Sequence, residues 1–109
     1  MSRAMETPEP PYFAAIFTSM RRAGDEGYAE MAEMMVALAK LQPGFLGMES
    51  TRDGEGFGIT VSYWESLEAI KAWHLDAAHG EAQRLGREKW YESFALRICR
   101  VERAYSWPK

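Results

Sequence analysis

The side chains best suited to acid–base chemistry in this sequence are two histidines, His74 and His79. A neutral imidazole at either position could take a proton from an acidic phenolic or enolic molecule, or donate a hydrogen bond to it. On one continuous helix the two rings would lie about 140° apart around the axis, so they could not grip a metal ion together. His74 falls on the apolar face of that helix, and His79 reaches this face only if the helix breaks between Leu75 and Ala78.

Each histidine also has a purely structural interpretation. A His74 ring held by a backbone or water hydrogen bond would need no chemical role. Asp76 could orient the ring of His79, although such pairs on helix surfaces are commonly solvated. We therefore predict His79, His74 and the neighbouring Trp73 as candidate catalytic residues, with the structural interpretation open.

Aromatic and thioether side chains give the second chemical signal, because they could line a pocket for a flat apolar ligand. The same residues could instead fill a core or a dimer interface, which is their more common use. Trp90 and Tyr91 precede the last predicted strand and are expected at the pocket mouth. The predicted pocket residues are Phe17, Met35, Tyr63, Trp64, Trp73, Trp90 and Tyr91.

Composition limits the class of protein. The 109 residues fit one domain, and a hydrophobic share of 47% with a net charge of −3 is typical of a globular chain. Apolar runs fall short of the roughly 20 residues that span a bilayer, so we expect no membrane insertion. Charges of both signs interleave along the chain, so we expect no nucleic-acid binding. The lone Cys99 and the lack of a recognisable leader favour a cytoplasmic location. No phosphate loop, zinc-ligand spacing or Ser/His/Asp set is found, so neither a cofactor nor a metal is expected.

The positioning elements follow from periodicity. The prolines near the start predict a disordered tail at 1–11, with a single domain at 12–107. An apolar run at 12–19 predicts the first strand. Asp25 can cap a helix whose apolar residues recur three and four positions apart from Tyr28 to Ala39.

A β-hairpin is predicted by two strand patterns, at 45–52 and 57–64, that flank a glycine-bearing turn. The second arm alternates between large apolar residues and small or polar ones. One face should therefore meet the first helix, while the other carries the smaller groups. The apolar set is Phe57, Ile59, Val61 and Tyr63.

Ser66 can cap a second helix, whose continuity is made doubtful by Gly80 and Gly86. The last strand is predicted at 94–107. Its inward-facing set changes parity along the strand, which implies either a bulge or a second burial environment. The apolar face of the second helix collects Leu67, Ile70, Trp73, Ala77, Ala78 and Leu85.

The order βαββαβ predicts an α+β, ferredoxin-like fold, with two helices on one face of a four-stranded antiparallel sheet. Two helices cannot bury all of the apolar residues, so the other face of the sheet needs a cover. We therefore expect a homodimer through the sheet faces and the C-terminal strand. The surplus comprises Tyr12, Ile16, Met48, Trp64 and part of the last strand.

Two segments, QPGFLGMES at 42–50 and SYWESLEA at 62–69 leading to Trp73, resemble those of antibiotic-biosynthesis-monooxygenase domains. The resemblance covers 12–107 and implies a dimeric α+β barrel with a hydrophobic pocket between sheet and helices. Active relatives oxygenate polycyclic aromatic molecules, or degrade haem, without a dedicated flavin or a permanently held metal. The chain looks most similar to a bacterial subgroup of mostly uncharacterised proteins, which shares Gly24-Asp25, Gly27-Tyr28, Ala82-Gln83, Gly86 and Trp90-Tyr91.

The sequence departs from the characterised relatives at two positions. Haem-degrading members use an asparagine on the first strand, but this chain has none, and their haem-ligating histidine falls at Gln83, a poor axial ligand. The leading interpretation is a cofactor-independent monooxygenase-like protein that binds a small aromatic or apolar substrate. A non-catalytic ligand-binding or stress-related dimeric module is the first alternative. A haem-binding or haem-degrading protein with atypical residues is the second, and Gln83 disfavours it.

Overall fold

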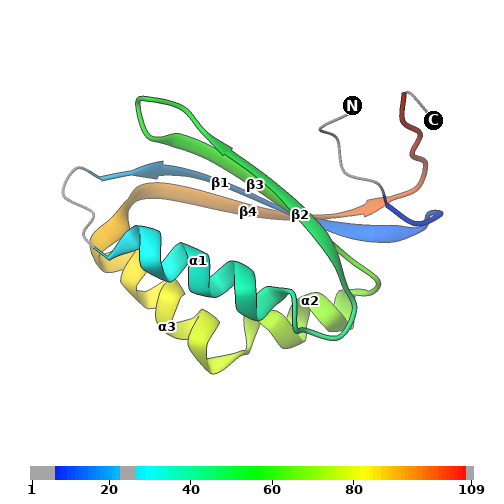
Figure 1. Cartoon of the computed structure of the whole chain (residues 1–109), viewed down its shortest axis with the longest axis horizontal. Coiled ribbons are helices and arrows are strands. Elements are labelled where there is room, and N and C mark those ends of the chain that lie inside the picture. The colour runs from blue at the N-terminus through cyan, green and yellow to red at the C-terminus, as the bar shows by residue number, and fades with distance from the viewer. Residues whose placement is uncertain (1–6, 23–26, 108–109) are drawn as a thin grey trace.

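A four-stranded antiparallel sheet with helices on one face forms the fold (Figure 1). The computed structural model describes residues 7–22 and 27–107, except for the side chains of 77–79. The sheet order β2-β3-β1-β4 confirms the predicted ferredoxin-like α+β arrangement. The elements are β1 (Tyr12–Arg21), α1 (Tyr28–Ala39), β2 (Phe45–Arg52), β3 (Phe57–Trp64), α2 (Leu67–His74), α3 (Ala77–Leu85), a π-helical turn (Gly86–Trp90) and β4 (Tyr91–Val101).

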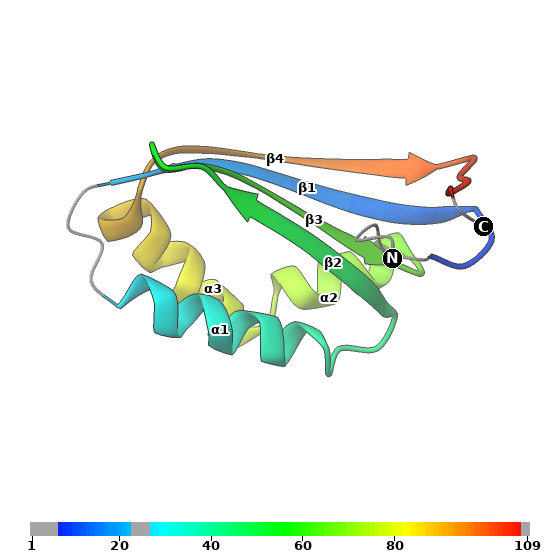
Figure 2. The same ribbon diagram turned by 45° about the horizontal axis from the view of Figure 1, so that its top comes forward.

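The register of the central strand β1 decides which residues face the helices. Phe17 lies opposite Thr60 of β3 and opposite Leu96 of β4. Neighbouring residues alternate between the two faces of a strand, so odd positions of β1 share a face with even positions of β3 and β4. Figure 2 shows that α1, α2 and α3 all lie under this face.

The prediction for the two faces of β3 is wrong. Thr60, Ser62 and Trp64 face the helices, whereas Ile59, 37% exposed, and Tyr63 face away from them. Alternation gives the period of a strand but not which side is covered. The helices stand off from the sheet around a cavity, so small hydroxyl side chains fit beneath them better than a full apolar layer does.

The helix boundaries agree with local signals. The α1 range matches the predicted one, although the proposed cap Asp25 lies outside the described residues. Ser66 caps α2 as predicted, its Oγ accepting from the Ala69 N–H at 3.1 Å. The chain then breaks after His74 and resumes helical geometry at Ala77, so the interrupted alternative is the observed one.

The loop between α1 and β2 packs tightly against α2. Gly44 has φ +84°, and a Cβ at this position would lie 2.7 Å from the Cβ of Ala69. Its carbonyl accepts from the Glu65 N–H at 2.8 Å. Only glycine combines this positive φ with so close an approach to Ala69 without strain. The contact fixes where β2 enters the sheet.

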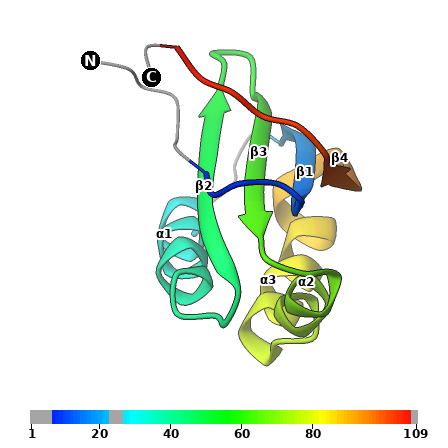
Figure 3. The same ribbon diagram turned by 90° about the vertical axis from the view of Figure 1, so that its right-hand side faces the viewer.

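The last strand is shorter than predicted at its C-terminal end. A register irregularity lies at its start, where Met20 opposes Ser93 and Arg21 opposes Tyr91, and pairing is then regular to Val101. A bulge at 98–101 is therefore not the cause of the predicted change in which residues of this strand face inward. Beyond the strand the chain turns away from the sheet (Figure 3), and Tyr105 and Trp107 are 94% and 85% exposed.

Candidate functional site

A cavity of about 400 Å³ lies between the sheet and the helices. All four strands, the three α-helices and the π-helical turn contribute to its wall. It is mainly apolar, with a few hydroxyl, amide and imidazole groups, the composition usual for small-molecule sites. The lining residues are Ala15, Phe17, Tyr28, Met31, Ala32, Met35, Val36, Ala39, Met48, Ser50, Thr60, Ser62, Trp64, Ile70, Trp73, His74, Ala82, Gln83, Arg87, Trp90, Tyr91, Phe94 and Leu96.

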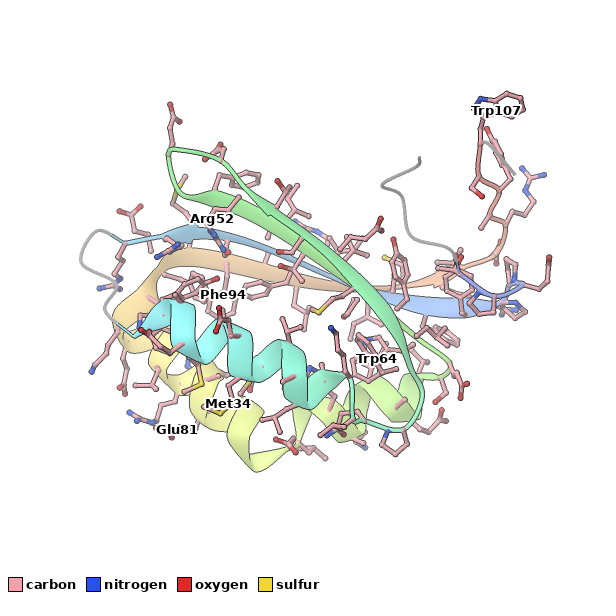
Figure 4. All side chains as sticks on the ribbon, in the orientation of Figure 1. Met34, Arg52, Trp64, Glu81, Phe94 and Trp107 are labelled. Carbon is pink, nitrogen blue, oxygen red and sulfur yellow. The ribbon has the colours of Figure 1, made fainter. Side chains whose placement is uncertain are left out.

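One end of the cavity is built on Trp64, which is 1% exposed and lies between the sheet and α2 (Figure 4). Its ring centroid is 5.2 Å from that of Phe45 and 6.4 Å from that of Trp73, with the two indoles nearly parallel. The indole N–H donates to Ser62 Oγ at 2.9 Å. Trp64 therefore has no donor left for a ligand and offers only an apolar surface.

An imidazole and an amide meet at the helix break. His74 Nδ1 lies 3.0 Å from Gln83 Nε2, across the gap between α2 and α3. When this amide nitrogen donates, Nδ1 accepts, and a neutral ring carries its proton on Nε2 as a donor. Turning the Gln83 amide by 180° presents its oxygen instead, which makes Nδ1 the donor and Nε2 the base. The pair can therefore supply either role to a ligand.

The opposite end of the cavity is polar. Arg52, at the end of β2, donates from Nη1 to the carbonyls of Ser19 and Gly56 at 3.4 and 2.5 Å. Its Nη2 donates to Ser19 Oγ at 2.9 Å and to the Tyr28 hydroxyl at 3.2 Å. The guanidinium lies against Gly58, where a Cβ would come within 2.5 Å of Arg52 Cζ. Arg52 points from the hairpin into the space above α1 (Figure 4).

Tyr28 joins this group to Tyr91, the first residue of β4. The Tyr91 hydroxyl donates to that of Tyr28 at 3.2 Å, and the rings meet edge to face at 5.8 Å. Burial, followed by the hydrogen bond to Tyr28, raises the pKa of Tyr91 well above its usual value. Tyr91 is therefore a neutral hydroxyl donor throughout the neutral pH range.

The wall of the cavity that the sheet forms carries a further pair of hydroxyl groups. Ser50 Oγ and Thr60 Oγ1, on paired positions of β2 and β3, lie 2.7 Å apart. The two hydroxyl groups hydrogen-bond to one another, which gives this part of the sheet a polar patch beside the apolar walls. The sequence contains one signal for this pair, because Ser50 and Thr60 are hydroxyl residues on the two strands of the predicted hairpin. The apolar alternation of 57–63 instead predicts that Thr60 faces away from the first helix.

The structure brings most of the predicted site residues together. Around the cavity lie His74, Trp73, Phe17, Met35, Trp64, Trp90 and Tyr91. The side chain of His79 lies outside the described residues, and only its place near the start of α3 is known. Tyr63 is not part of the group, because its strand parity points it to the opposite face.

Tyr63 instead belongs to a small cluster on the outer face of the sheet. Its hydroxyl donates to Glu49 Oε1 at 2.7 Å, and its ring meets that of Tyr12 edge to face at 5.9 Å. Burial and the contact with Glu49 raise the pKa of Tyr63 to about 12. We therefore leave Tyr63 out of the candidate site.

Sequence reasoning missed the polar end of the cavity. Arg52 and Tyr28 lie 24 residues apart, and Tyr28 and Tyr91 lie 63 apart, so no local pattern links them. Among the described side chains, no three of the His, Cys, Asp and Glu groups gather as metal ligands would. In the same part of the chain, no helix is long and apolar enough to cross a membrane.

Comparison with known proteins places this geometry in a family. The model of the antibiotic biosynthesis monooxygenase family matches residues 11–85. The uncharacterized protein YqjZ of Bacillus subtilis (strain 168) is 54% identical over 98 residues, which cover 90% of this chain and 86% of that protein.

Two solved structures have the same fold at low sequence identity. SnoaB of Streptomyces nogalater, a cofactor-independent oxygenase solved in a mutant form, aligns with a TM-score of 0.74 at 10% identity. The alignment covers 92% of this chain and 100% of SnoaB. Rv0793 of Mycobacterium tuberculosis aligns with a TM-score of 0.75 at 12% identity, covering 87% and 99% of the two chains.

Proposed function

Because the chain belongs to the antibiotic biosynthesis monooxygenase family, we propose that it is a monooxygenase-like protein that binds a small aromatic molecule in its cavity and oxygenates it without a bound cofactor. The observation that carries this proposal is the cavity itself, where aromatic walls meet a histidine–amide pair. Flat apolar walls suit an aromatic ring system, and the imidazole suits proton removal from an acidic C–H or O–H group.

The proposed reaction needs only the substrate and dioxygen. A methylene group between aromatic rings becomes a carbonyl: one atom of dioxygen enters the product, and the other leaves as water with the two methylene hydrogens. The substrate supplies all four electrons. In this scheme His74 removes the first proton through Nε2, with the Gln83 amide turned so that its oxygen accepts from Nδ1, while Trp73 and Trp64 hold the rings. His79 stays a second candidate for the proton transfer.

We also propose that the protein works as a homodimer through the outer face of the sheet and the end of the chain. Apolar side chains outside the cavity support this, since Phe57 and Ile59 of β3 and the terminal Tyr105 and Trp107 are exposed in one subunit. Such a surface would be unusual on a monomer. A second copy would cover it symmetrically.

A non-catalytic binding module is the second candidate function, favoured by the absence of asparagine from the whole chain. Such a protein would keep the cavity and its ligand but lack turnover. The haem alternative receives less support, because Gln83 hydrogen-bonds His74 where the haem-degrading relatives are expected to have the axial ligand.

Thermal-shift screening against anthrones, quinols and haem, followed by oxygen-electrode assays of each hit, separates these functions. The monooxygenase proposal expects stabilisation together with oxygen uptake, and loss of uptake of roughly 100-fold or more in His74→Ala with binding retained. The same assay on His79→Ala tests the second histidine. Stabilisation without uptake would establish the binding module, and a Soret shift with haem would favour the haem alternative.

A further inference from the structure

The charge on the cavity wall is opposite to that of the chain as a whole. The sequence holds 16 Asp and Glu residues against 13 Lys and Arg, yet no carboxylate occurs among the described residues that line the cavity. Among the described residues, the wall carries one guanidinium group, that of Arg87. Two more guanidinium groups stand behind the wall, with Arg21 Cζ and Arg52 Cζ 4.2 and 5.7 Å from the centre of the Tyr28 ring. A ligand in this cavity meets a positive potential.

The hydroxyl pair at the polar end has one hydrogen to spare. Tyr28 and Tyr91 hold two hydroxyl hydrogens, and their mutual bond uses one of them. The Tyr28 oxygen also accepts from Arg52, so its own hydrogen has no acceptor among the described residues. Both rings line the cavity. The hydrogen is thus available to a ligand, and a ligand amine would find the oxygen already occupied by donors.

Arg52 strengthens this donor without reaching the ligand itself. All four of its Nη hydrogens have acceptors: the Ser19 and Gly56 carbonyls, Ser19 Oγ and the Tyr28 hydroxyl. A hydroxyl that accepts from a cation and from a second hydroxyl is a stronger donor than an isolated one. Its best acceptor is an oxygen that carries negative charge.

We propose that Tyr28 and Tyr91, backed by Arg52, form an oxyanion-binding subsite that selects aromatic ligands bearing a phenolate or enolate oxygen. The subsite rests on the proposed function, since it deepens the ligand class of the same cavity. The surrounding Phe17, Trp90 and Phe94 side chains give the rings of the ligand an apolar seat beside the polar group. The oxygen is bound by a donor that is fixed before the ligand arrives.

The test compares two probes of one shape, 1,2-dihydroxyanthraquinone and unsubstituted anthraquinone, by titration into the purified full chain. The first changes colour when its phenol ionises, so its absorbance reports the pKa of the bound hydroxyl. The wild type should lower that pKa by about one unit or more, because a charge-assisted hydrogen bond favours the ionised form. Anthraquinone has the same ring system and carbonyl groups without a phenol, so it reports occupation of the cavity without a phenolate oxygen.

Three variants isolate the subsite. Tyr28→Phe and Tyr91→Phe singly, and more strongly together, should weaken binding of the dihydroxy probe about 10- to 100-fold. Anthraquinone binding should weaken much less, because its neutral carbonyl oxygens are poorer acceptors than a phenolate oxygen. Gly58→Ala should act in the same direction without touching either tyrosine, because its Cβ would displace Arg52. Gly54→Ala is the matched control, since a Cβ there meets nothing within 4 Å.

The outcomes separate the subsite from the proposed function. If the variants bind both probes as the wild type does, or the bound phenol keeps its free pKa, the oxyanion subsite is wrong while cavity binding stands. If folded wild-type protein binds neither probe, both proposals fail for this class of ligand. Urea unfolding of each variant shows that lost binding is not lost folding.

Discussion

The two faces of strand β3 are arranged in the opposite way from the usual one, in which the large apolar residues face the helices. The face toward the helices carries the hydroxyl residues Thr60 and Ser62 beside a cavity, whereas the outer face carries Ile59, which is 37% exposed, and Val61. A face that must leave room for a ligand needs small side chains, and a face that packs against another sheet needs large apolar ones. On β3 the large apolar residues therefore lie on the face that we propose as the dimer interface.

Removal of Trp64 should have the largest effect on the helix-facing side. Trp64→Ala deletes a side chain that is 1% exposed and packed on Phe45 and Trp73, so the free energy of unfolding should fall by about 3–5 kcal/mol. Urea denaturation at one protein concentration measures the loss. Leu41→Ala is the matched control, expected within about 0.5 kcal/mol of wild type because that side chain is exposed and lies outside the proposed interface. Equal losses in the two variants would contradict the described packing.

A charge on the outer face should separate the subunits. Ile59→Lys places an ammonium where we propose that two sheets meet, so the dimer should dissociate to monomers with unchanged circular dichroism. Sedimentation equilibrium at micromolar concentration gives the mass. Leu41→Lys changes an equally apolar but exposed residue beyond α1 and should stay dimeric. A dimeric Ile59→Lys protein would move the interface elsewhere.

The smallest expected effect concerns the Tyr63–Glu49 contact on the outer face. Tyr63→Phe removes one hydrogen bond and should lower the free energy of unfolding by about 1 kcal/mol or less near neutral pH. The pKa of Tyr63 is raised from 10 to about 12 by folding, so its contribution is present below pH 10 and is lost as pH rises toward 12. Urea titrations from about pH 8 to pH 11 should show the two proteins converging. A gap that stays constant over this range would mean that folding does not raise the pKa of Tyr63.

Local signals predicted the elements well, because each depends on neighbouring residues. The hairpin strands at 45–52 and 57–64 have their predicted bounds, and Ser66 caps α2 as expected. The faces of β3 could not be assigned the same way, since the side that is covered depends on where the helices dock. The last strand likewise ends at Val101 because pairing with β1 ends there at Tyr12.

The candidate site likewise has one part that neighbouring residues predict and one part that depends on how the elements dock. The aromatic residues Trp64, Trp73 and Trp90 could be predicted as cavity wall because their side chains suit a flat ligand. The polar end was not, since Tyr28 reads as an ordinary apolar-face residue of a helix, and Arg52 as an exposed charge beside a turn. Their meeting depends on the closure of the sheet and the docking of α1.

Arg52 ties together three parts of the chain that lie far apart in the sequence. Its contact with Gly56 needs only the hairpin, its contacts with Ser19 need β1 beside β3, and its contact with Tyr28 needs α1 in place. The spare hydroxyl donor thus exists only in the fully assembled subunit. A ligand bound there would stabilise the docked position of α1, because the donor that it binds is in place only when Tyr28 meets Arg52. Hydrogen-exchange protection gained on binding would then concentrate in Tyr28–Ala39 and leave the hairpin largely unchanged.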